Sequence, residues 1–538
     1  MDLFNYSRRL SSVVHVGNTP LGETNPIRLQ SMANVSTMNT EAAIAQAMKM
    51  IEAGAEYVRF AAQGEREARN LGRIRRALQE KGYATPLVAD IHFNAAAANV
   101  AAQEVEKVRI NPGNYAATPE LARRRFIPFL RLCKERQTAI RIGVNHGSLS
   151  ERMMNRYGDT PEGMVASCME FLEICGEENF TDVVISIKAS HTVVMVKTVR
   201  LLVSEMERNG IRFPLHLGVT EAGDGEDGRI KSAVGIGALL ADGIGDTIRV
   251  SLSEAPEKEL PVAGALVNYI REREKHTPIV ALPAPGYNHL AMERRLSRKV
   301  EEIGGGRPPV VLSADALERY PSARFVPISF NTLTEETIRM LSENKSTVAI
   351  LSSSHRNAVG EMRAAIHCLI AAGCDVPLIL RRDYREDHPE SLVLKAAADF
   401  GAILLDGFGD GLMMHTERMT TADTEQVLLG ILQATRLRIT RTEYISCPGC
   451  GRTLYDLQTT IARVKSATSH LTGLKIGIMG CIVNGPGEMA DADYGYVGAG
   501  QGKINLYKGK QCLMKGLPEA GAVESLVQLI KENGDWKD

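Results

Sequence analysis

The sequence predicts an α/β protein that begins with a (β/α)8 TIM barrel, continues with a barrel-like α/β insert and ends in a small α+β domain. Three observations lead to this expectation. A strand-then-helix unit repeats through the first 260 residues, a shorter repeat runs from about residue 277 to 437, and a glycine-rich segment with closely spaced cysteines follows. We place the domains at residues 1–268, 269–440 and 441–538 of the 538-residue chain.

The barrel prediction depends on the number of strands, because a doubly wound sheet shows the same alternation. Eight parallel strands are the number that closes this kind of barrel. The helical stretch Glu41–Glu52, which stops before Gly54, is typical of the helices between them. The expected strands are Ile27–Gln30, Tyr57–Phe60, Leu87–Asp90, Lys107–Ile110, Ala139–Val144, Val183–Ser186, Leu215–Val219 and Thr247–Val250.

Polar side chains stand at the carboxyl ends of these strands, which all meet at one mouth of a barrel. They are Arg59, Asp90, His92, Arg109, Asn111, Arg141, Asn145, His146, Ser186, Lys188, His216, Glu221, Arg249 and Ser251. One guanidinium group can bind two phosphate oxygens at once, so the mouth is expected to hold a compact phosphate or diphosphate ester. Each arginine alone also fits a solvated surface residue, and His92 and His146 also fit structural histidines. The glycine-rich loop that ends near Lys231 fits either a lid carrying a cation or an ordinary surface loop.

The middle segment repeats the strand pattern less completely. Expected strands are Ile279–Leu282, Val310–Leu312, Phe325–Ile328, Val348–Leu351, Leu378–Leu380 and Ile403–Leu405. Six strands indicate an incomplete second barrel or an open α/β layer. Their ends lack the arginine, asparagine and histidine set of the first segment, so we expect a scaffold here rather than chemistry.

The last hundred residues carry a CxxC pair, Cys447 and Cys450, followed by Cys481 and then Glu488. Three thiolates fit a zinc site, or an iron–sulfur cluster with one iron left for another ligand. Glu488 is the preferred fourth ligand, because a Gly-Pro-Gly turn precedes it, whereas Cys512 lies in a solvated-looking stretch. The remaining cysteines fit apolar helical patterns as core thiols: Cys133, Cys168, Cys175, Cys368 and Cys374.

Composition narrows the function classes. Lys plus Arg number 63 against 64 Asp plus Glu, so no overall field attracts the chain to nucleic acid or to a membrane. Nine cysteines, without a disulfide-framework pattern, fit a reducing compartment. The start has no signal-peptide core, and no apolar run is long enough to span a bilayer. We therefore expect a cytoplasmic protein.

Several motifs together resemble one family, the 4-hydroxy-3-methylbut-2-enyl diphosphate synthases, iron–sulfur enzymes of the non-mevalonate isoprenoid pathway. They are Cys447-Pro-Gly-Cys450-Gly-Arg, Ile478 to Glu488, Leu29-Gln-Ser-Met32, Ala89 to Phe93, Val108 to Asn114, Ile142 to Leu149, His216 to Glu221 and Gly243 to Leu252. The resemblance covers the first 260 and the last hundred residues. The middle segment resembles the insert of the large, three-domain form of the family, and we expect its bacterial version.

The resemblance implies a reaction and a cofactor. The family opens the ring of 2-C-methyl-D-erythritol 2,4-cyclodiphosphate by two-electron reduction with loss of water, giving a linear allylic diphosphate. By analogy, Cys447, Cys450, Cys481 and Glu488 hold one 4Fe-4S cluster. A carboxylate is a labile iron ligand, so Glu488 is expected to leave when a substrate oxygen binds.

The resemblance also assigns the barrel residues. The positions that bind the diphosphate match Arg59, His92, Arg109, Arg141, Asn145 and Lys231. Glu259 matches a family acid near the reacting carbon and is the expected proton donor. Because Glu254 and Glu257 lie close by in the sequence, a solvated glutamate stays open as the other interpretation of Glu259.

Electrons are expected from reduced ferredoxin or flavodoxin, because the chain shows no clear nucleotide-binding glycine motif. Whether the protein is a monomer or a homodimer stays open. We hypothesise that the insert lets the C-terminal domain close on the barrel of its own chain. Two alternative interpretations of the sequence remain: a zinc-stabilised phosphate-binding or regulatory protein, and a cobalamin- or folate-linked barrel protein.

Overall fold

A computed structural model describes residues 2–313, 315–386, 388–483 and 485–537. The chain forms two compact units. The larger is built from residues 10–228, 245–264 and 441–538, and the smaller from residues 229–244 and 265–440 together with the first nine residues. The larger unit thus contains both the strands of the first segment and the cysteine-rich C-terminal segment. The predicted domain boundaries at 268 and 440 remain predictions.

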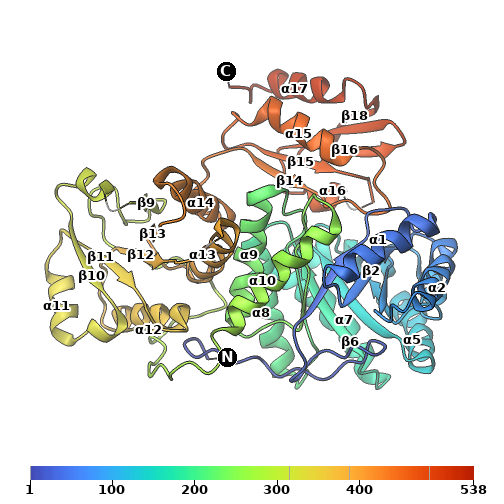
Figure 1. The fold of residues 1–538 in the computed structure, drawn as a ribbon, viewed down its shortest axis with the longest axis horizontal. Coiled ribbons are helices and arrows are strands. Elements are labelled where there is room, and N and C mark those ends of the chain that lie inside the picture. Colours follow the sequence, from blue (N-terminus) through green and yellow to red (C-terminus); the bar gives the residue numbers. More distant parts are fainter. Residues whose placement is uncertain (1, 314, 387, 484, 538) are drawn as a thin grey trace. The chain divides into compact units, whose positions relative to one another are not determined.

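The first segment forms the expected barrel (Figure 1). Its strands are β1 (Arg28–Met32), β2 (Tyr57–Ala61), β3 (Leu87–Asp90), β4 (Lys107–Ile110), β5 (Ala139–Asn145), β6 (Val183–Lys188), β7 (His216–Leu217) and β8 (Thr247–Ile248). All pair in parallel in the order β6-β5-β4-β3-β2-β1-β8-β7. A parallel bridge between Ile185 and Leu215 joins the two outer strands and closes the ring. The predicted TIM-barrel class is confirmed.

Helices follow the strands along the chain, as a parallel sheet requires. They are α1 (Thr40–Glu52), α2 (Glu65–Glu80), α3 (Ala95–Ala101), α4 (Pro112–Tyr115), α5 (Pro119–Arg136), α6 (Glu151–Tyr157), α7 (Pro161–Glu177), α8 (Thr192–Arg208), α9 (Gly225–Ala241) and α10 (Glu259–Arg271). Sequence signals set their limits: Asn39 caps α1 by accepting from the Ala42 amide, and Gly54 leaves the helix with a φ of +108°.

The interior of this barrel is unusually polar. Barrels of this class usually fill the inside with layers of Val, Ile and Leu. Here the completely or almost completely buried residues include Lys107 and Arg109 of β4, Arg141 of β5, and Ser186 and Lys188 of β6. Burying such cations is costly unless they find partners.

The middle segment forms an open parallel sheet in the smaller unit. Its strands are β9 (Val310–Leu312), β10 (Arg324–Ile328), β11 (Thr347–Ser352), β12 (Leu378–Asp383) and β13 (Gly411–His415), in the order β10-β11-β12-β13-β9. The helices are α11 (Glu335–Glu343), α12 (Ala358–Ala371), α13 (Pro389–Leu405) and α14 (Thr421–Ala434). This is the strand order of a barrel, except that β9 and β10 do not pair with each other among the described residues.

Two of the six strands expected in this segment were wrong, and one was missed. Ile279–Leu282 lies in a loop, where Val280 and Leu282 are 88 % and 84 % exposed. Ile403–Leu405 is the buried last turn of α13, because a short apolar run looks the same in a strand and in a buried helix. The missed strand, β13, reads Gly-Leu-Met-Met-His and contains none of the β-branched residues that mark strands.

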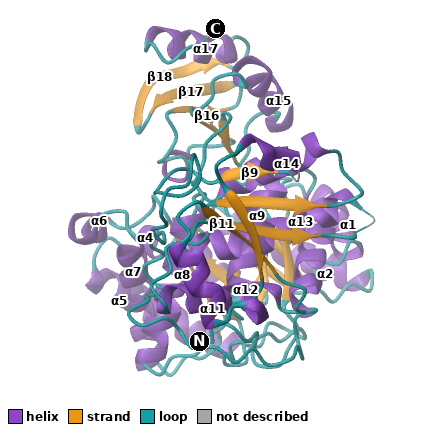
Figure 2. Ribbon diagram, turned by 90° about the vertical axis from the view of Figure 1, so that its left-hand side faces the viewer, coloured by secondary structure: helices purple, strands orange, loops and turns teal. Residues whose placement is uncertain are grey.

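The C-terminal segment is a mixed sheet covered by helices (Figure 2). Strands β14 (Glu443–Ser446), β15 (Lys475–Met479) and β16 (Tyr494–Gly500) are parallel, and β17 (Lys503–Lys508) and β18 (Gln511–Pro518) continue the sheet in antiparallel pairing. Helices α15 (Leu457–Thr468) and α17 (Ala522–Glu532) share one hydrophobic core with the sheet, and α16 (Gly485–Glu488) is a single turn. No helix in the described ranges has the length and apolarity needed to cross a bilayer.

Candidate active site

Within the larger unit, the barrel mouth and the cysteine loops line one cavity of about 80 Å³. From the barrel come Met32, Arg59, His92, Arg109, Asn145, Lys188, Thr220, Glu221, Arg249 and Ser251. From the C-terminal segment come Cys447, Pro448, Gly449, Cys450, Arg452, Met479, Gly480, Cys481, Gly485 and Glu488. The structure thus brings together most of the predicted site residues, and it does so within one chain.

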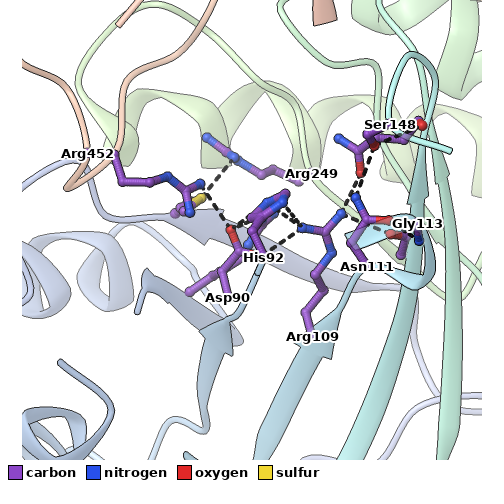
Figure 3. A network of polar contacts seen from close by, with 12 residues as sticks. Asp90, His92, Arg109, Asn111, Gly113, Ser148, Arg249 and Arg452 are labelled. Carbon is purple, nitrogen blue, oxygen red and sulfur yellow. Dashed lines mark hydrogen bonds and ion pairs between the residues drawn. The ribbon is translucent and has the colours of Figure 1, made fainter. Parts of the chain in front are cut away.

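Asp90, at the end of β3, is the acidic centre of the barrel mouth (Figure 3). Its carboxylate accepts from Arg59 at 2.8 Å and from Arg109 at 3.1 Å. Arg452 of the C-terminal segment reaches the same carboxylate at 3.3 Å. Burial acts to raise the pKa of Asp90, but the charges of Arg59 and Arg109, together with the contact to the His92 ring, outweigh it and hold that pKa well below its usual range. Asp90 is therefore an anion that fixes cations from both segments.

Arg109 extends this network toward the cysteine loops. Its guanidinium donates to the Gly143 carbonyl at 3.0 Å and to Oδ1 of Asn145 at 2.5 Å. The Asn145 amide in turn donates to Oε1 of Glu488. Gly143 leaves the room for this path, because a Cβ there would stand 2.5 Å from Nε of Arg109. A continuous chain of hydrogen bonds thus connects Asp90 with Glu488.

His92 is neutral in this setting. Burial and the neighbouring Arg109 charge lower its pKa to about 3. Its Nε2 accepts from Arg109 at 2.5 Å, which requires an unprotonated nitrogen. His92 therefore offers its ring to the cavity as a neutral hydrogen-bonding group.

Other buried cations have no counterion. All three guanidinium nitrogens of Arg141 lack a hydrogen-bond partner among the described residues, and so does Nζ of Lys107, which lies 3.9 Å from the Tyr57 ring centre. Burial, and then the charges of Arg59 and Arg109, lower the pKa of Arg141 well below its usual range. Lys188 lines the cavity, and burial followed by the Arg59 and Arg141 charges lowers its pKa in the same way. An anionic ligand would relieve this strain.

Opposite these cations lie the three predicted cysteine ligands. The Gly480 amide donates to Sγ of Cys447 at 3.2 Å, and Ser253 of the barrel donates to the Cys447 carbonyl at 2.9 Å. No set of three His, Cys, Asp or Glu side chains among the described residues is gathered tightly enough for a single metal ion. The three thiols nevertheless line one cavity, and a four-iron cluster spreads its ligands over several metal atoms. The donor set therefore fits a cluster better than a single zinc ion.

Glu488 is held by the barrel. Asn145 donates to its Oε1, Thr220 donates to its Oε2 at 3.0 Å, and Ser190 donates to its carbonyl at 3.3 Å. The carboxyl of Glu221 lies against it, on a residue with a φ of +48°. Burial raises the pKa of both carboxyls, and for Glu488 the neighbouring Glu221 raises it further. The two carboxyls therefore share a proton more readily than they ionise together.

The backbone also joins the two segments at this point. Gly147, in the loop after β5, has a φ of +80°, and a Cβ there would collide with the carbonyl group of Gly487. A Cβ on Gly487 would in turn stand 2.8 Å from the Gly147 carbonyl oxygen. Nothing larger than hydrogen fits between the two main chains next to Glu488.

Three predicted site residues, Glu259, Lys231 and Arg141, do not line the cavity. Glu259 is buried, and its carboxylate accepts from Arg249 at 2.8 and 3.0 Å and from Ser31 at 2.6 Å. Arg249 lines the cavity, whereas Glu259 does not. Lys231 is buried on α9 and is not among the lining residues. Arg141 lies deeper on β5, four residues before Asn145.

Sequence reasoning missed Arg452, Thr220 and Met32 as cavity residues, and it named Lys188, Glu221, Arg249 and Ser251 only as strand ends. For Arg452 a signal was present: it follows Cys450 by two residues, so it had to lie close to the thiol. Thr220 and Met32 carry no charge, and only the closed barrel reveals them.

Fold and site together define a class, a TIM-barrel protein whose cation-lined mouth is capped by a cysteine-bearing domain of the same chain. Residues 11–264 match the family model described as the GcpE TIM-barrel domain, and residues 443–532 match the GcpE protein C-terminal domain. The chain belongs to the GcpE family, as its motifs predicted.

Full-length relatives carry one common name. A protein of Parabacteroides distasonis is 61 % identical, with all of both chains covered. One of Porphyromonas gingivalis is 54 % identical over all of both chains, and one of Akkermansia muciniphila is 43 % identical over 99 % of this chain and 98 % of its own. Each is named 4-hydroxy-3-methylbut-2-en-1-yl diphosphate synthase (flavodoxin).

Proposed function

We propose that the protein reduces 2-C-methyl-D-erythritol 2,4-cyclodiphosphate to (E)-4-hydroxy-3-methylbut-2-enyl diphosphate in the cytoplasm, with electrons from a flavodoxin-type donor. In this reaction a ring C–O bond to phosphate and the bond to a neighbouring hydroxyl break, a C=C bond forms, and the hydroxyl leaves as water. Counted on neutral forms, the reaction consumes two electrons and two protons. Membership of the GcpE family and the names of the full-length relatives support this assignment.

The observation that carries the proposal is the set of buried cations without counterions beneath three cysteines. Arg141 and Lys107 have no hydrogen-bond partner among the described residues, and Lys188 lines the cavity above them. A diphosphate supplies several oxygens to such groups and would neutralise charge that the protein leaves uncompensated. A zinc-stabilised regulatory protein gives no reason for such a costly arrangement.

In this proposal the residues around Asp90 orient the diphosphate. Arg59 and Arg109 are fixed by Asp90, so their remaining N–H groups point in set directions, and His92 adds a neutral ring. Asn145 links the proposed diphosphate-binding residues to Glu488, because it accepts a hydrogen bond from Arg109 and donates one to Glu488. Lys231, on α9, stays a proposed diphosphate ligand.

Cys447, Cys450 and Cys481 would hold a 4Fe-4S cluster, which supplies electrons and a Lewis-acidic iron when bound. Glu488 is the proposed fourth ligand. Its contacts with Asn145 and Thr220 support a labile role, because the barrel offers its carboxyl group hydrogen bonds away from the cysteines. Once released from iron, Glu488 would share a proton with the neighbouring Glu221 inside the cavity.

Glu259 was expected to donate a proton, and that role remains a prediction. Its contacts support a positioning role instead, since both of its oxygens accept from Arg249. Removing the carboxylate would release the Arg249 guanidinium into the cavity. Glu259→Gln should therefore raise the KM for substrate more than it lowers kcat, whereas loss of a proton donor would lower kcat alone.

The decisive experiment is anaerobic isolation followed by reconstitution, iron and sulfide analysis, and turnover of the cyclic diphosphate with reduced methyl viologen. We expect about four irons and four sulfides per chain and a linear diphosphate product by phosphorus NMR. A colourless zinc protein, or a sulfide-loaded protein that leaves the cyclic compound unreduced, would refute the proposal.

A further inference from the structure

A second hollow touches the CxxC loop from outside. This groove has a volume of about 610 Å³ and lies within the larger unit, across the contact between barrel and C-terminal segment. The barrel contributes residues of the β1–α1 loop, of α1 and of the turn before α10, namely Asn34, Val35, Ala42, Ala45, Gln46, Lys49, Ser253, Ala255, Pro256 and Glu257. The C-terminal segment contributes Pro448, Gly449, Thr453, Tyr455, Asp456, Leu457 and Gln458.

Pro448 and Gly449, the two residues between the cysteines of the CxxC pair, line both this groove and the substrate cavity. They are the only residues that the two sets of lining side chains have in common among the described residues. The loop that carries Cys447 and Cys450 is therefore a wall with the substrate cavity on one side and the groove on the other.

Electrons have to reach the cysteines without passing through bound substrate. On the cavity side, Arg452 crosses to Asp90 and Glu488 is held by the barrel, so a protein partner has no access there once substrate is bound. On the groove side only the CxxC loop itself intervenes. The outer face of Pro448 and Gly449 is therefore the short path between a redox group outside the protein and the thiols.

We propose that this groove is the docking site of the electron donor, a flavodoxin-type protein that places the exposed edge of its flavin against Pro448 and Gly449. The inference rests on the proposed function. The hydroxyl of Ser253 donates to the carbonyls of Ser446 and Cys447, and these hydrogen bonds hold the barrel against the C-terminal segment. The groove lies at the outer edge of this contact.

The walls of the groove suit such a partner. Pro448 has no N–H group, and Val35, Ala42 and Leu457 add apolar surface against which a planar ring can lie. The Tyr455 hydroxyl is fixed by donation to the Met479 carbonyl at 3.0 Å, which keeps its ring in place at the edge. A rigid, partly apolar wall limits the entropy lost when two proteins associate.

The charges on the rim indicate which partner groups fit. Asp456 is occupied as the N-cap of α15, where it accepts from the Thr459 hydroxyl at 2.7 Å. Lys49, at the end of α1, is exposed and forms no ion pair with the described residues. The third charged lining residue, Glu257, is acidic and lies on the turn before α10, so an acidic group of the partner fits only on the Lys49 side of the groove. There it would meet Lys49, and the association should weaken as salt is added.

Two variants test the site, each with a control outside the groove, at the C-terminal end of α2 or at the residue that follows it. Ala45→Trp fills the groove and Lys49→Glu reverses the rim charge. Gln79→Trp and Lys81→Glu make the same changes at exposed positions that do not line it. None of the four positions belongs to the proposed catalytic or diphosphate-binding groups.

Each variant is assayed with reduced flavodoxin and, separately, with reduced methyl viologen, which is small enough to need no protein interface. We expect the KM for flavodoxin to rise at least tenfold in Ala45→Trp and several-fold in Lys49→Glu. Turnover with the viologen should stay within twofold of wild type, and both controls should resemble wild type. Flavodoxin binding to the cluster-free chain, followed by fluorescence anisotropy, should weaken in the same order.

The outcomes separate the two proposals. An unchanged KM for flavodoxin in both groove variants would overturn the docking site while leaving the proposed function intact. Equal losses with flavodoxin and viologen would show damage to the site itself and would likewise overturn the inference. No turnover of the wild type with either reductant would instead refute the proposed function.

Discussion

The barrel and the open sheet of the smaller unit both carry arginines on parallel strands, but the charge of these arginines is compensated in the open sheet and left uncompensated at Arg141 of the barrel. On β12, Arg381 donates to both oxygens of Asp383 at 3.0 and 3.2 Å, and Arg382 donates to Asp399 at 3.0 Å. On β5, Arg141 is fully buried and finds no partner in the described part of the chain. The presence of arginines alone therefore does not mark a ligand site. What marks it is buried arginine charge that no carboxylate of the protein neutralises.

The size of the hollow does not distinguish the two. The open sheet carries a larger pocket, about 330 Å³, lined by Arg381 and by the exposed side chains of Arg319 and His415. Cations that solvent or a carboxylate can satisfy impose no need for a ligand. The buried barrel cations impose that need, and this supports the scaffold interpretation of the middle segment.

The strongest test of this difference between the two regions is to remove one arginine from each. Arg141→Ala should lower kcat/KM for the cyclic diphosphate by about 10²–10³-fold, because truncating one member of a buried charged contact costs about 2–5 kcal/mol. Arg381→Ala should leave kcat/KM within twofold. Comparable losses in the two variants, measured with the viologen assay, would show that the open sheet takes part in the reaction.

The comparison also assumes that the barrel site is completed by its own chain. A Cys450→Ser chain mixed with an Arg141→Ala chain should therefore recover no activity beyond the sum of the two, since each chain lacks one half of the same cavity. Activity near a quarter of the wild-type value after mixing would mean that the C-terminal segment of one chain serves the barrel of another. Size-exclusion chromatography of the mixture serves as the control for association.

Inward-facing glycines sharpen the comparison further. Gly143→Ala should displace the Arg109 guanidinium, and overpacking of this size costs about 1–3 kcal/mol. The expected result is a rise of about tenfold in the KM for substrate, accompanied by a lower thermal midpoint. Gly411→Ala in β13 meets Ile379 at 2.6 Å and Val310 at 2.8 Å, so it should lower thermal stability without changing the KM. Exchange of these two outcomes would contradict the assignment.

Mild acid should lower the free energy of unfolding of the protein, because the buried His92 resists protonation. The pKa of His92 is lowered to about 3 in the folded chain, whereas an unfolded histidine titrates near 6.5. Below pH 6.5 the unfolded state binds a proton that the folded state refuses, so stability is lost as the pH falls from about 6.5 toward 3. The loss amounts to about 1.4 kcal/mol per pH unit for one such group.

His92→Gln should flatten this dependence of the calorimetric transition on pH. The control is His15→Gln, because the His15 ring is 73 % exposed. Equal slopes for wild type and His92→Gln would show that His92 is not the group responsible.

Much of the barrel could be predicted because its strands are buried on both faces and rich in Val and Ile, as in Val183–Lys188. The open sheet was harder, since Gly411–His415 has methionines where strands usually have branched residues. At the site, strand position predicted which residues reach the mouth. It did not predict that Asp90 fixes Arg59, Arg109 and Arg452, because that arrangement exists only once distant segments meet.

The approach of Gly147 to Gly487 has a consequence for oxygen tolerance. Where two main chains touch, no side chain lies between them that could rotate aside, so the contact beside Glu488 is closed by backbone packing alone. Substituting alanine at Gly147 would prop this contact open. With the proposed cluster reconstituted, we expect such a variant to bleach in air faster than the parent protein.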